Sequence, residues 1–410
     1  MTNNLSKPQI RFKGFTEAWE QRKVNDLMDV GSVKRIHQSD WTQSGIRFLR
    51  ARDIVANHNG ENVEDPLFIS KEKYDEYSLI SGKVKKGDLL VTGVGTIGIP
   101  MLISNEKPIY FKDGNVIWLK NNNSTDGKFL FFSYDSKTVK SFISDEAGIG
   151  TVGTYTIDSC KRTPLNLPNI EEQKKIGTLF EQLDSLITLH QRKYEKLQQI
   201  KKSLLAKMFP AEGDSTPKIR FKGFTEAWEQ RKLGEIVDVF DGVHQTPDYK
   251  SSGIMFLSVE NISTLQSQKY ISKEAFEKDY KIRPQKGDIL MTRIGDVGTP
   301  NVVKSDDLVA FYVSLALLKP KKIESYYLCY EIQSNFFQKG LKERTLVTAI
   351  PQKINKDEIG KILTFVPVDL NEQNKIGELF NNLDHLITLH QRECEMMKNI
   401  KKTLLDKMFA

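Results

Sequence analysis

The chain has 410 residues, of which 39% are apolar and 28% are charged, a composition typical of a globular protein with two or three domains. A formal net charge of +7 permits a polyanionic partner, although a nucleic-acid-binding tail would be far more basic. The three cysteines lie far apart, which excludes paired-cysteine zinc sites, iron–sulfur clusters and a disulfide scaffold. No apolar stretch approaches the ~20 residues of a membrane helix, so we expect a cytoplasmic protein with no membrane partner.

Two segments of the sequence occur twice. Residues 10–23, IRFKGFTEAWEQRK, recur without a change at residues 219–232, and residues 172–209 match residues 372–409 at 25 of 38 positions. Because a period of about 200 residues is far longer than that of a solenoid, each copy can hold its own domain. The sequence therefore predicts two similar units in tandem, with pseudo-twofold symmetry.

Between its repeated ends, the first unit shows the patterns of mixed α and β structure. Strands are expected at residues 46–54, 88–92 and 116–119, and a helix is expected at residues 129–146. The second unit should repeat these elements near Met255, Asp288, Val309 and Ser325, although the middles of the two copies are only thinly alike. We therefore predict an α+β fold, with mixed α/β structure in each unit.

Each unit ends in a long apolar stripe. In residues 172–209 the apolar side chains recur mostly every three or four residues without a proline, which predicts an amphipathic helix. Its 38 residues would span about 57 Å, more than a small core can cover. The second tail repeats the stripe, so we expect the two helices to pack as an antiparallel coiled coil; the alternative is that each helix covers only its own domain. The predicted helix–helix interface consists of Leu179, Leu183, Leu186, Leu197, Leu204, Leu379, Leu383, Leu386, Met397 and Leu404.

The turn-forming sequence PAEGDSTP at residues 210–217 marks the connection between the copies. The expected domains are residues 1–170, a spacer helix at 171–209, a linker at 210–218, a second domain at 219–370 and a second spacer helix at 371–410. Trp19 and Trp228 stand in the identical segments, where we expect them in the core or at a subunit interface.

The sequence has no recognisable catalytic motif, although one segment matches a cofactor-binding pattern. The sequence GVGTIG at residues 93–98 follows an apolar run and formally matches the dinucleotide-binding fingerprint. Pro100 blocks the helix that would hold the pyrophosphate, and the second copy has Arg293 in place of the first glycine, so a glycine-rich turn is expected instead. There is no phosphate loop, and His190 and His390 on the long helices are expected to pack or to form hydrogen bonds. We predict no catalytic residue and no metal site.

Several motifs of the two copies coincide with those of one protein family. They are the tandem units, the KGD motif at residues 86–88 and 286–288, DGVHQTPDYKSSGIMFL from Asp241, and the runs LPNIEEQKKI and VDLNEQNKI that open the two tails. Through them the chain resembles, over essentially its whole length, the specificity subunit of type I restriction-modification enzymes. The second copy has VPVDLNEQ in place of the more usual proline-rich entry to the helix, which affects only the local turn.

The resemblance implies two target-recognition domains, each reading one half of a bipartite, asymmetric target in double-stranded DNA. The two helices would hold these domains apart and dock two modification (methyltransferase) subunits. The resemblance also implies no catalysis and no cofactor in this chain. S-adenosylmethionine, ATP and Mg²⁺ would bind to partners, which are the modification subunits and the restriction subunits that translocate and cut DNA.

Residues that differ between the copies at matching positions are the candidates for reading DNA, because the two units would read different half-sites. The sharpest exchanges are Arg50 for Ser258 and Gly93 for Arg293, since only one copy then carries a side chain that can pair with guanine. The predicted set is Lys34, Arg35, His37, Gln38, Arg50, Arg52, Asp53, Thr92 and Gly93, then His244, Gln245, Thr246, Tyr249, Ser258, Glu260, Asn261, Thr292 and Arg293, with Thr154, Tyr155, Gln352 and Lys353 at the DNA backbone.

The sequence is also compatible with two other functions. One is a self-contained enzyme, either a nucleotide-cofactor oxidoreductase built on residues 93–98 or a methyltransferase with an unrecognised site. The other is a coiled-coil adaptor whose domains bind protein. For the DNA reader, fully paired helices would separate the half-sites by at most about 17 base pairs and would act as a ruler.

Overall fold

The computed structural model describes residues 7–147 and 153–409. They form two compact units, one from Met1–His190 with Arg392–Ala410 and the other from Gln191–Gln391. The predicted linker lies within the second unit, where Glu212 pairs with Lys339 at 2.6 Å. In the described part of the chain, no helix is both long and apolar enough to cross a membrane.

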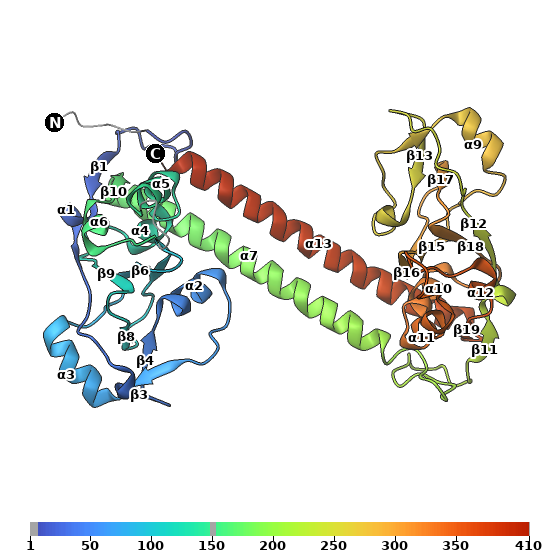
Figure 1. The fold of residues 1–410 in the computed structure, drawn as a ribbon, viewed down its shortest axis with the longest axis horizontal. Coiled ribbons are helices and arrows are strands. Elements are labelled where there is room, and N and C mark those ends of the chain that lie inside the picture. Colours follow the sequence, from blue (N-terminus) through green and yellow to red (C-terminus); the bar gives the residue numbers. More distant parts are fainter. Residues whose placement is uncertain (1–6, 148–152, 410) are drawn as a thin grey trace. The chain divides into compact units, whose positions relative to one another are not determined.

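The first unit is built on three sheets, with strand orders β1-β10, β2-β9-β6-β7 and β3-β5-β4-β8 (Figure 1). Its elements are β1 (Glu20–Lys23), α1 (Val24–Leu27), β2 (Asp29–Gly31), η1 (Gln38–Asp40), β3 (Trp41–Thr42), β4 (Ile46–Leu49), α2 (Ala51–Asn59), β5 (Leu67–Ile69), α3 (Lys71–Ser81), β6 (Leu89–Thr92), β7 (Pro100–Leu102), β8 (Ile109–Phe111), β9 (Val116–Lys120), α4 (Gly127–Ser133), α5 (Lys137–Glu146), α6 (Ile157–Arg162), β10 (Pro164–Leu167), the first half of α7 (Ile170–Leu205) and the second half of α13 (Leu370–Met408).

The second unit repeats this plan with sheets of order β11-β19, β12-β18-β15-β16 and β14-β13-β17. Its elements are the second half of α7, then β11 (Glu229–Lys232), α8 (Leu233–Ile236), β12 (Val237–Asp241), β13 (Ile254–Leu257), η2 (Val259–Asn261), β14 (Tyr270–Ile271), α9 (Lys273–Asp279), β15 (Ile289–Ile294), β16 (Asp296–Val302), β17 (Val309–Phe311), β18 (Leu315–Pro320), α10 (Ser325–Ile332), α11 (Asn335–Arg344), α12 (Lys356–Gly360), β19 (Leu363–Val366) and the first half of α13.

Both faces of the central sheet are buried in each unit. Along β6, Leu89 and Val91 enter a core shared with α4, α5 and α6, whereas Leu90 enters a second core with α2 and α3. Along β15, Ile289 and Leu290 divide between two cores in the same way. Because neighbouring side chains of a strand point to opposite faces, these strands are apolar without alternation, which is why the sequence shows them as continuous apolar runs.

The predicted strand at residues 46–54 is only partly correct. β4 ends at Leu49, and the chain then turns into α2, because the Asp53 carboxylate accepts a hydrogen bond from Arg50 N at 2.8 Å and closes the first helical turn. The predicted helix at residues 129–146 is two helices, α4 and α5, because the Ser136 hydroxyl accepts a bond from Val139 N at 3.4 Å and starts a new helix.

The sequence GVGTIG forms the turn between the antiparallel strands β6 and β7. A dinucleotide-binding glycine loop must lead from a strand into a helix whose first turn holds the pyrophosphate. Since a strand follows here, the structure removes the nucleotide-cofactor alternative at residues 93–98.

The repeated sequence at the start of each long helix anchors that helix to its own β-structure. Glu172 is buried and accepts bonds from Arg11 at 2.6 and 2.7 Å, and Gln173 Oε1 accepts a bond from Asp126 N at 3.0 Å. At Gly177 the start of α4 comes so close that an added Cβ would lie 2.7 Å from Asp126 Oδ1. The second unit has the same contacts at positions 372, 373 and 377, so the near-identity of the repeats is explained by anchoring.

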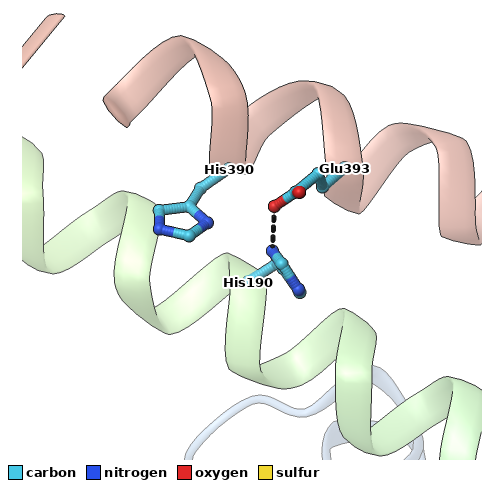
Figure 2. A group of neighbouring side chains, drawn as sticks. All are labelled: His190, His390 and Glu393. Atoms are coloured by element: carbon cyan, nitrogen blue, oxygen red, sulfur yellow. Dashed lines mark ion pairs between the residues drawn. The ribbon is translucent and has the colours of Figure 1, made fainter. Parts of the chain in front are cut away.

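Within each unit the two long helices pack antiparallel. In the first unit, Asp184 pairs with Lys401 at 2.6 Å, and further along α7 His190 Nδ1 lies 2.8 Å from the Glu393 carboxylate. Figure 2 shows His190 on α7 facing Glu393 on α13. The partner's number falls as the number along α7 rises, as an antiparallel pair requires. His190 therefore contacts the facing helix, where it was predicted to pack or to form hydrogen bonds.

The second unit repeats the same pairing, with Lys201 2.7 Å from Asp384. The predicted interface leucines at positions 179, 183 and 404 pack in the first unit's apolar cluster at this site, and those at positions 197, 204, 379 and 383 pack in the second unit's main core. Leu186 and Leu386 are 41% and 40% exposed, and Met397 is half-buried, so the apolar stripe is wider than the face that each unit covers. Trp19 and Trp228 are buried, as expected.

Candidate nucleic-acid interface

The sheet topology of the first unit brings the predicted DNA-reading segments together. β2 and β6 both pair antiparallel with β9, so the end of β2, the end of β6 and the start of β9 lie at one edge. Beyond that edge lie residues 32–40, the turn at 93–99 and the loop at 112–115. β4 ends beside the same loop, since Lys112 N donates to Leu49 O at 2.8 Å. We refer to this edge as the loop end of the first unit.

The second unit has an equivalent loop end. β12 and β15 both pair antiparallel with β18, so residues 242–253, the turn at Gly295 and the loop at 312–314 gather at one edge. Tyr312 N donates to Leu257 O at 2.9 Å, which places the end of β13 there as well. In both units the segments that were predicted to read DNA therefore converge, although they are far apart in the sequence.

Arg293 is buried at this convergence, with 6% of its surface exposed. Its guanidinium pairs with Asp241 at the end of β12, and its Nε donates to Ile354 O at 3.0 Å. The side chain therefore ties the end of β15 to two neighbouring segments and is not free to reach a base. The second copy therefore carries Arg293 in place of Gly93 because the arginine side chain supports the neighbouring loops.

Arg50 and Asp53 hold each other at the start of α2. The Arg50 side chain donates to both carboxylate oxygens of Asp53 at 3.1 Å and to Asp65 O at 3.0 Å. In the second unit, Ser258 N donates to Asn261 Oδ1 at 3.0 Å, so the same turn is closed without an arginine. The guanidinium of Arg50 remains half-exposed at the loop end, where it can still offer donors to a base or a phosphate.

The predicted residues fall into three groups by exposure. The exposed group is Lys34, Arg35, His37, Gln38, Arg52, Thr154, His244, Gln245, Thr246, Tyr249, Glu260, Gln352 and Lys353. The half-buried group is Arg50, Ser258 and Asn261, and the buried group is Asp53, Thr92, Gly93, Tyr155, Thr292 and Arg293. Direct DNA contact stays a prediction for the first two groups, whereas burial assigns the third group to supporting the loops.

Two of the buried residues show this support directly. Thr92 Oγ1 accepts a bond from Ile99 N at 2.9 Å, and Thr292 Oγ1 accepts one from Thr299 N at 2.8 Å. Each hydroxyl closes the turn that follows its strand. Threonine therefore occurs at the matching position of both copies because its hydroxyl stabilises the turn in each unit.

The sequence interpretation missed residues of two kinds at the loop ends. Asp113 pairs with Arg35 at 2.7 Å, and a lone acid in a loop gives no sequence signal for such a contact. The other kind is a cluster of exposed apolar residues at positions 346, 347 and 350. Its signal was visible as the apolar run LVTAIP after a basic helix end, next to the predicted residues Gln352 and Lys353.

Comparison with known proteins agrees with this architecture. A family model for the type I restriction modification DNA specificity domain matches residues 16–199 and again residues 225–398. The type I restriction enzyme MjaVIII specificity subunit of Methanocaldococcus jannaschii is 26% identical over 303 residues, which cover 70% of this chain and 70% of that protein. The MjaIX specificity subunit of the same organism is 22% identical over 420 residues, which cover 95% and 92%.

The fold is similar to the crystal structure of the type I restriction-modification system S subunit from M. genitalium. The TM-score is 0.65 at 15% identity, with 99% of each chain covered. The two family matches coincide with the two copies of the repeat, and each contains one loop end. The chain belongs to the type I restriction modification DNA specificity family, whose members are the DNA-recognition subunits of type I restriction systems and are not themselves catalytic.

Proposed function

We propose that the chain reads a bipartite target in double-stranded DNA, with one half-site for each unit. The observation that carries the proposal is a shared framework with different loop ends. The helix anchors recur in both units, whereas the exposed residues 34, 35, 37 and 38 of the first unit correspond to the differently composed segment 244–249 of the second. Amide and basic side chains of this kind recognise base edges and phosphates, so two different sets can read two different sequences.

We propose further that α7 and α13 set the spacer between the half-sites and dock two modification subunits. Leu186 and Leu386 occupy matching positions and are 41% and 40% exposed, and Met396 is 54% exposed. Exposed apolar side chains at matching positions of α7 and α13 suit a partner of which two copies bind, each in the same way. In this proposal, restriction subunits join the complex in the cytoplasm, and the partner subunits bind S-adenosylmethionine, ATP and Mg²⁺.

The proposal is tested by single-molecule methylome sequencing of cells that carry the chain with its modification subunits. In one strain, residues 24–163 are exchanged for those of another specificity subunit, which leaves β1, β10 and the Arg11–Glu172 contact in place. In a matched strain, residues 233–362 are exchanged instead. We expect a split methylated motif in which each exchange changes a different half.

Two outcomes would contradict the proposal. If no split motif appears, the units do not read half-sites, and a protein adaptor becomes the better interpretation. If either exchange changes both halves of the motif, the two units are not independent readers.

A further inference from the structure

The loop that follows α11 in the second unit carries its apolar side chains outward. Leu346, Val347 and Ile350 are 45%, 66% and 100% exposed. The base of the loop is closed, since Leu346 N donates to Lys353 O at 2.8 Å and Ala349 N donates to Leu346 O at 3.3 Å. The three side chains therefore stand on a fixed loop, which we refer to as the apolar tip.

Basic residues flank the apolar tip on both sides. Lys342, Lys353 and Lys356 are exposed, and none of them pairs with a carboxylate in the part of the chain that the structure describes. A single exposed apolar residue needs no explanation, but three within five positions form a patch. An apolar patch between unpaired cations suits a partner that is polyanionic and also presents apolar groups. DNA is such a partner, because its phosphates surround grooves in which thymine methyl groups are exposed.

The apolar tip is joined to the loop end of the second unit. Gly295 N donates to Gln352 O at 2.9 Å, and Gln352 Nε2 donates to Gly295 O at 3.0 Å, so the tip shares its base with the turn between β15 and β16. The buried Arg293 reinforces this junction, because it binds both Ile354 O and Asp241, where residues 242–253 begin. The tip therefore lies beside the segment that carries the predicted base readers of this unit.

We infer that the apolar tip contacts base edges in a groove of the half-site read by the second unit. Ile350 is the leading contact, and the flanking lysines bind adjacent phosphates. This inference rests on the proposed DNA-reading function and adds to it an apolar element of specificity. An isoleucine carries no charge, so its contribution should depend on the base sequence and not on the salt concentration.

The test uses the complete complex of this chain with its modification subunits. Binding to a duplex with the target motif and to a duplex without it is measured over a range of salt concentrations, for the wild type, Ile350→Ser and Ile350→Leu. We expect Ile350→Ser to weaken binding to the target about tenfold and to leave binding to the other duplex unchanged. Ile350→Leu should retain most of the target affinity, since it keeps the apolar contact.

Two further variants serve as controls. Leu79→Ser removes a leucine that is 88% exposed on α3 of the first unit, and it should leave the affinity for the second unit's half-site unchanged. Lys353→Gln should weaken binding to both duplexes and lower the slope of log affinity against log salt by about one.

Three outcomes would overturn the inference. They are an unchanged target affinity in Ile350→Ser, an equal loss on both duplexes, and a failure of this variant to assemble with the modification subunits in the absence of DNA. The last outcome would assign the tip to a protein contact. Failure of the proposed function looks different, because the wild-type complex itself would then show no preference between the duplexes.

Discussion

At the scale of single residues, Glu331 is one of the buried acids of the described structure. It is fully buried in α10 and accepts hydrogen bonds from Thr364 Oγ1 at 2.8 Å, Phe365 N at 2.9 Å and Ser334 Oγ at 2.6 Å. Burial raises the pKa of Glu331 to about 7, although these hydrogen bonds act in the opposite direction. The residue ties α10 to β19, so its protonation is coupled to the stability of the second unit.

The stability of the second unit should therefore depend on pH through Glu331. An unfolded glutamate has a pKa of about 4.3, so the folded state binds more protons than the unfolded state between about pH 4.3 and 7. The protonated Glu331 therefore contributes about 3 kcal/mol to the free energy of unfolding. This contribution is fully present below about pH 4.3 and is lost as the pH rises towards 7. Glu331→Gln should flatten this part of the pH profile, as measured by urea unfolding between pH 5 and 8.

The exposed Glu343 supplies the matched control, because Glu343→Gln on the neighbouring α11 removes the same charge without removing a buried acid. Its pH profile should remain parallel to that of the wild type. If the profile of Glu331→Gln is also parallel to the wild type, Glu331 does not titrate between these pH values.

Buried polar residues also mark the limit of what the sequence could predict. In the first unit, Tyr134, Tyr155, Cys160 and Thr163 form a buried hydrogen-bonded group. The matching positions in the second unit are Ile332, Ile354, Ile359 and Ile362, and all four are buried. The same backbone accepts either a polar network or an aliphatic core, because each is internally satisfied. Tyr155, which was predicted to contact the DNA backbone, belongs to this buried network, and nothing in the sequence indicated that burial.

At the scale of elements, the long helices were predictable because spacings of three and four persist over 38 residues. Short elements were less predictable, since local caps decide them: Asp53 starts α2 where a strand was expected, and Ser136 divides one expected helix into two. The meeting of the loops at one edge followed from strand pairing, which a single sequence does not reveal. The predicted loop segments lie together at the loop ends, but the sequence did not separate their exposed members from their buried ones.

The two long helices should act as a ruler in the proposed reader. The units divide after His190 in α7 and after Gln391 in α13, so insertions at these points leave the anchors of both units untouched. Four extra residues lengthen a helix by about 6 Å, which is one to two base pairs at about 3.4 Å each. Inserting four residues into both helices should therefore lengthen the unspecified spacer of the methylated motif by about one or two base pairs. A motif with an unchanged spacer would rule out the ruler, and an insertion in one helix alone should abolish methylation.

At the scale of the whole molecule, the first unit joins residues near the two ends of the sequence. Ile10 N donates to Lys407 O at 3.0 Å, and the second unit has the same bond between Ile219 N and Lys207 O at 2.9 Å. In the second unit residues 208–218 connect the two partners covalently, whereas in the first unit the partners meet without a connection. Both units therefore contain the same backbone hydrogen bond, but only in the second unit does a short segment of chain join its two partners.

A circular permutant should consequently fold and function. It would begin at Asp214, run to Phe409, continue through a copy of residues 210–218 into Ile10, and end at Gly213. The new ends lie in an exposed loop, and the exposed Glu212–Lys339 pair beside them contributes little to stability. We expect its melting temperature to lie within a few degrees of the wild type and its methylated motif to be the same.

The matched control for the permutant places the new ends at Gly295 instead, with the same added connection. This break separates β15 from β16 and releases the turn that Gln352 holds, so it should lower the melting temperature strongly. Equal loss of stability in both permutants would show that the connection at residues 208–218 is itself required. Folding of the first permutant alone would show that the repeated contact, rather than chain continuity, closes each unit.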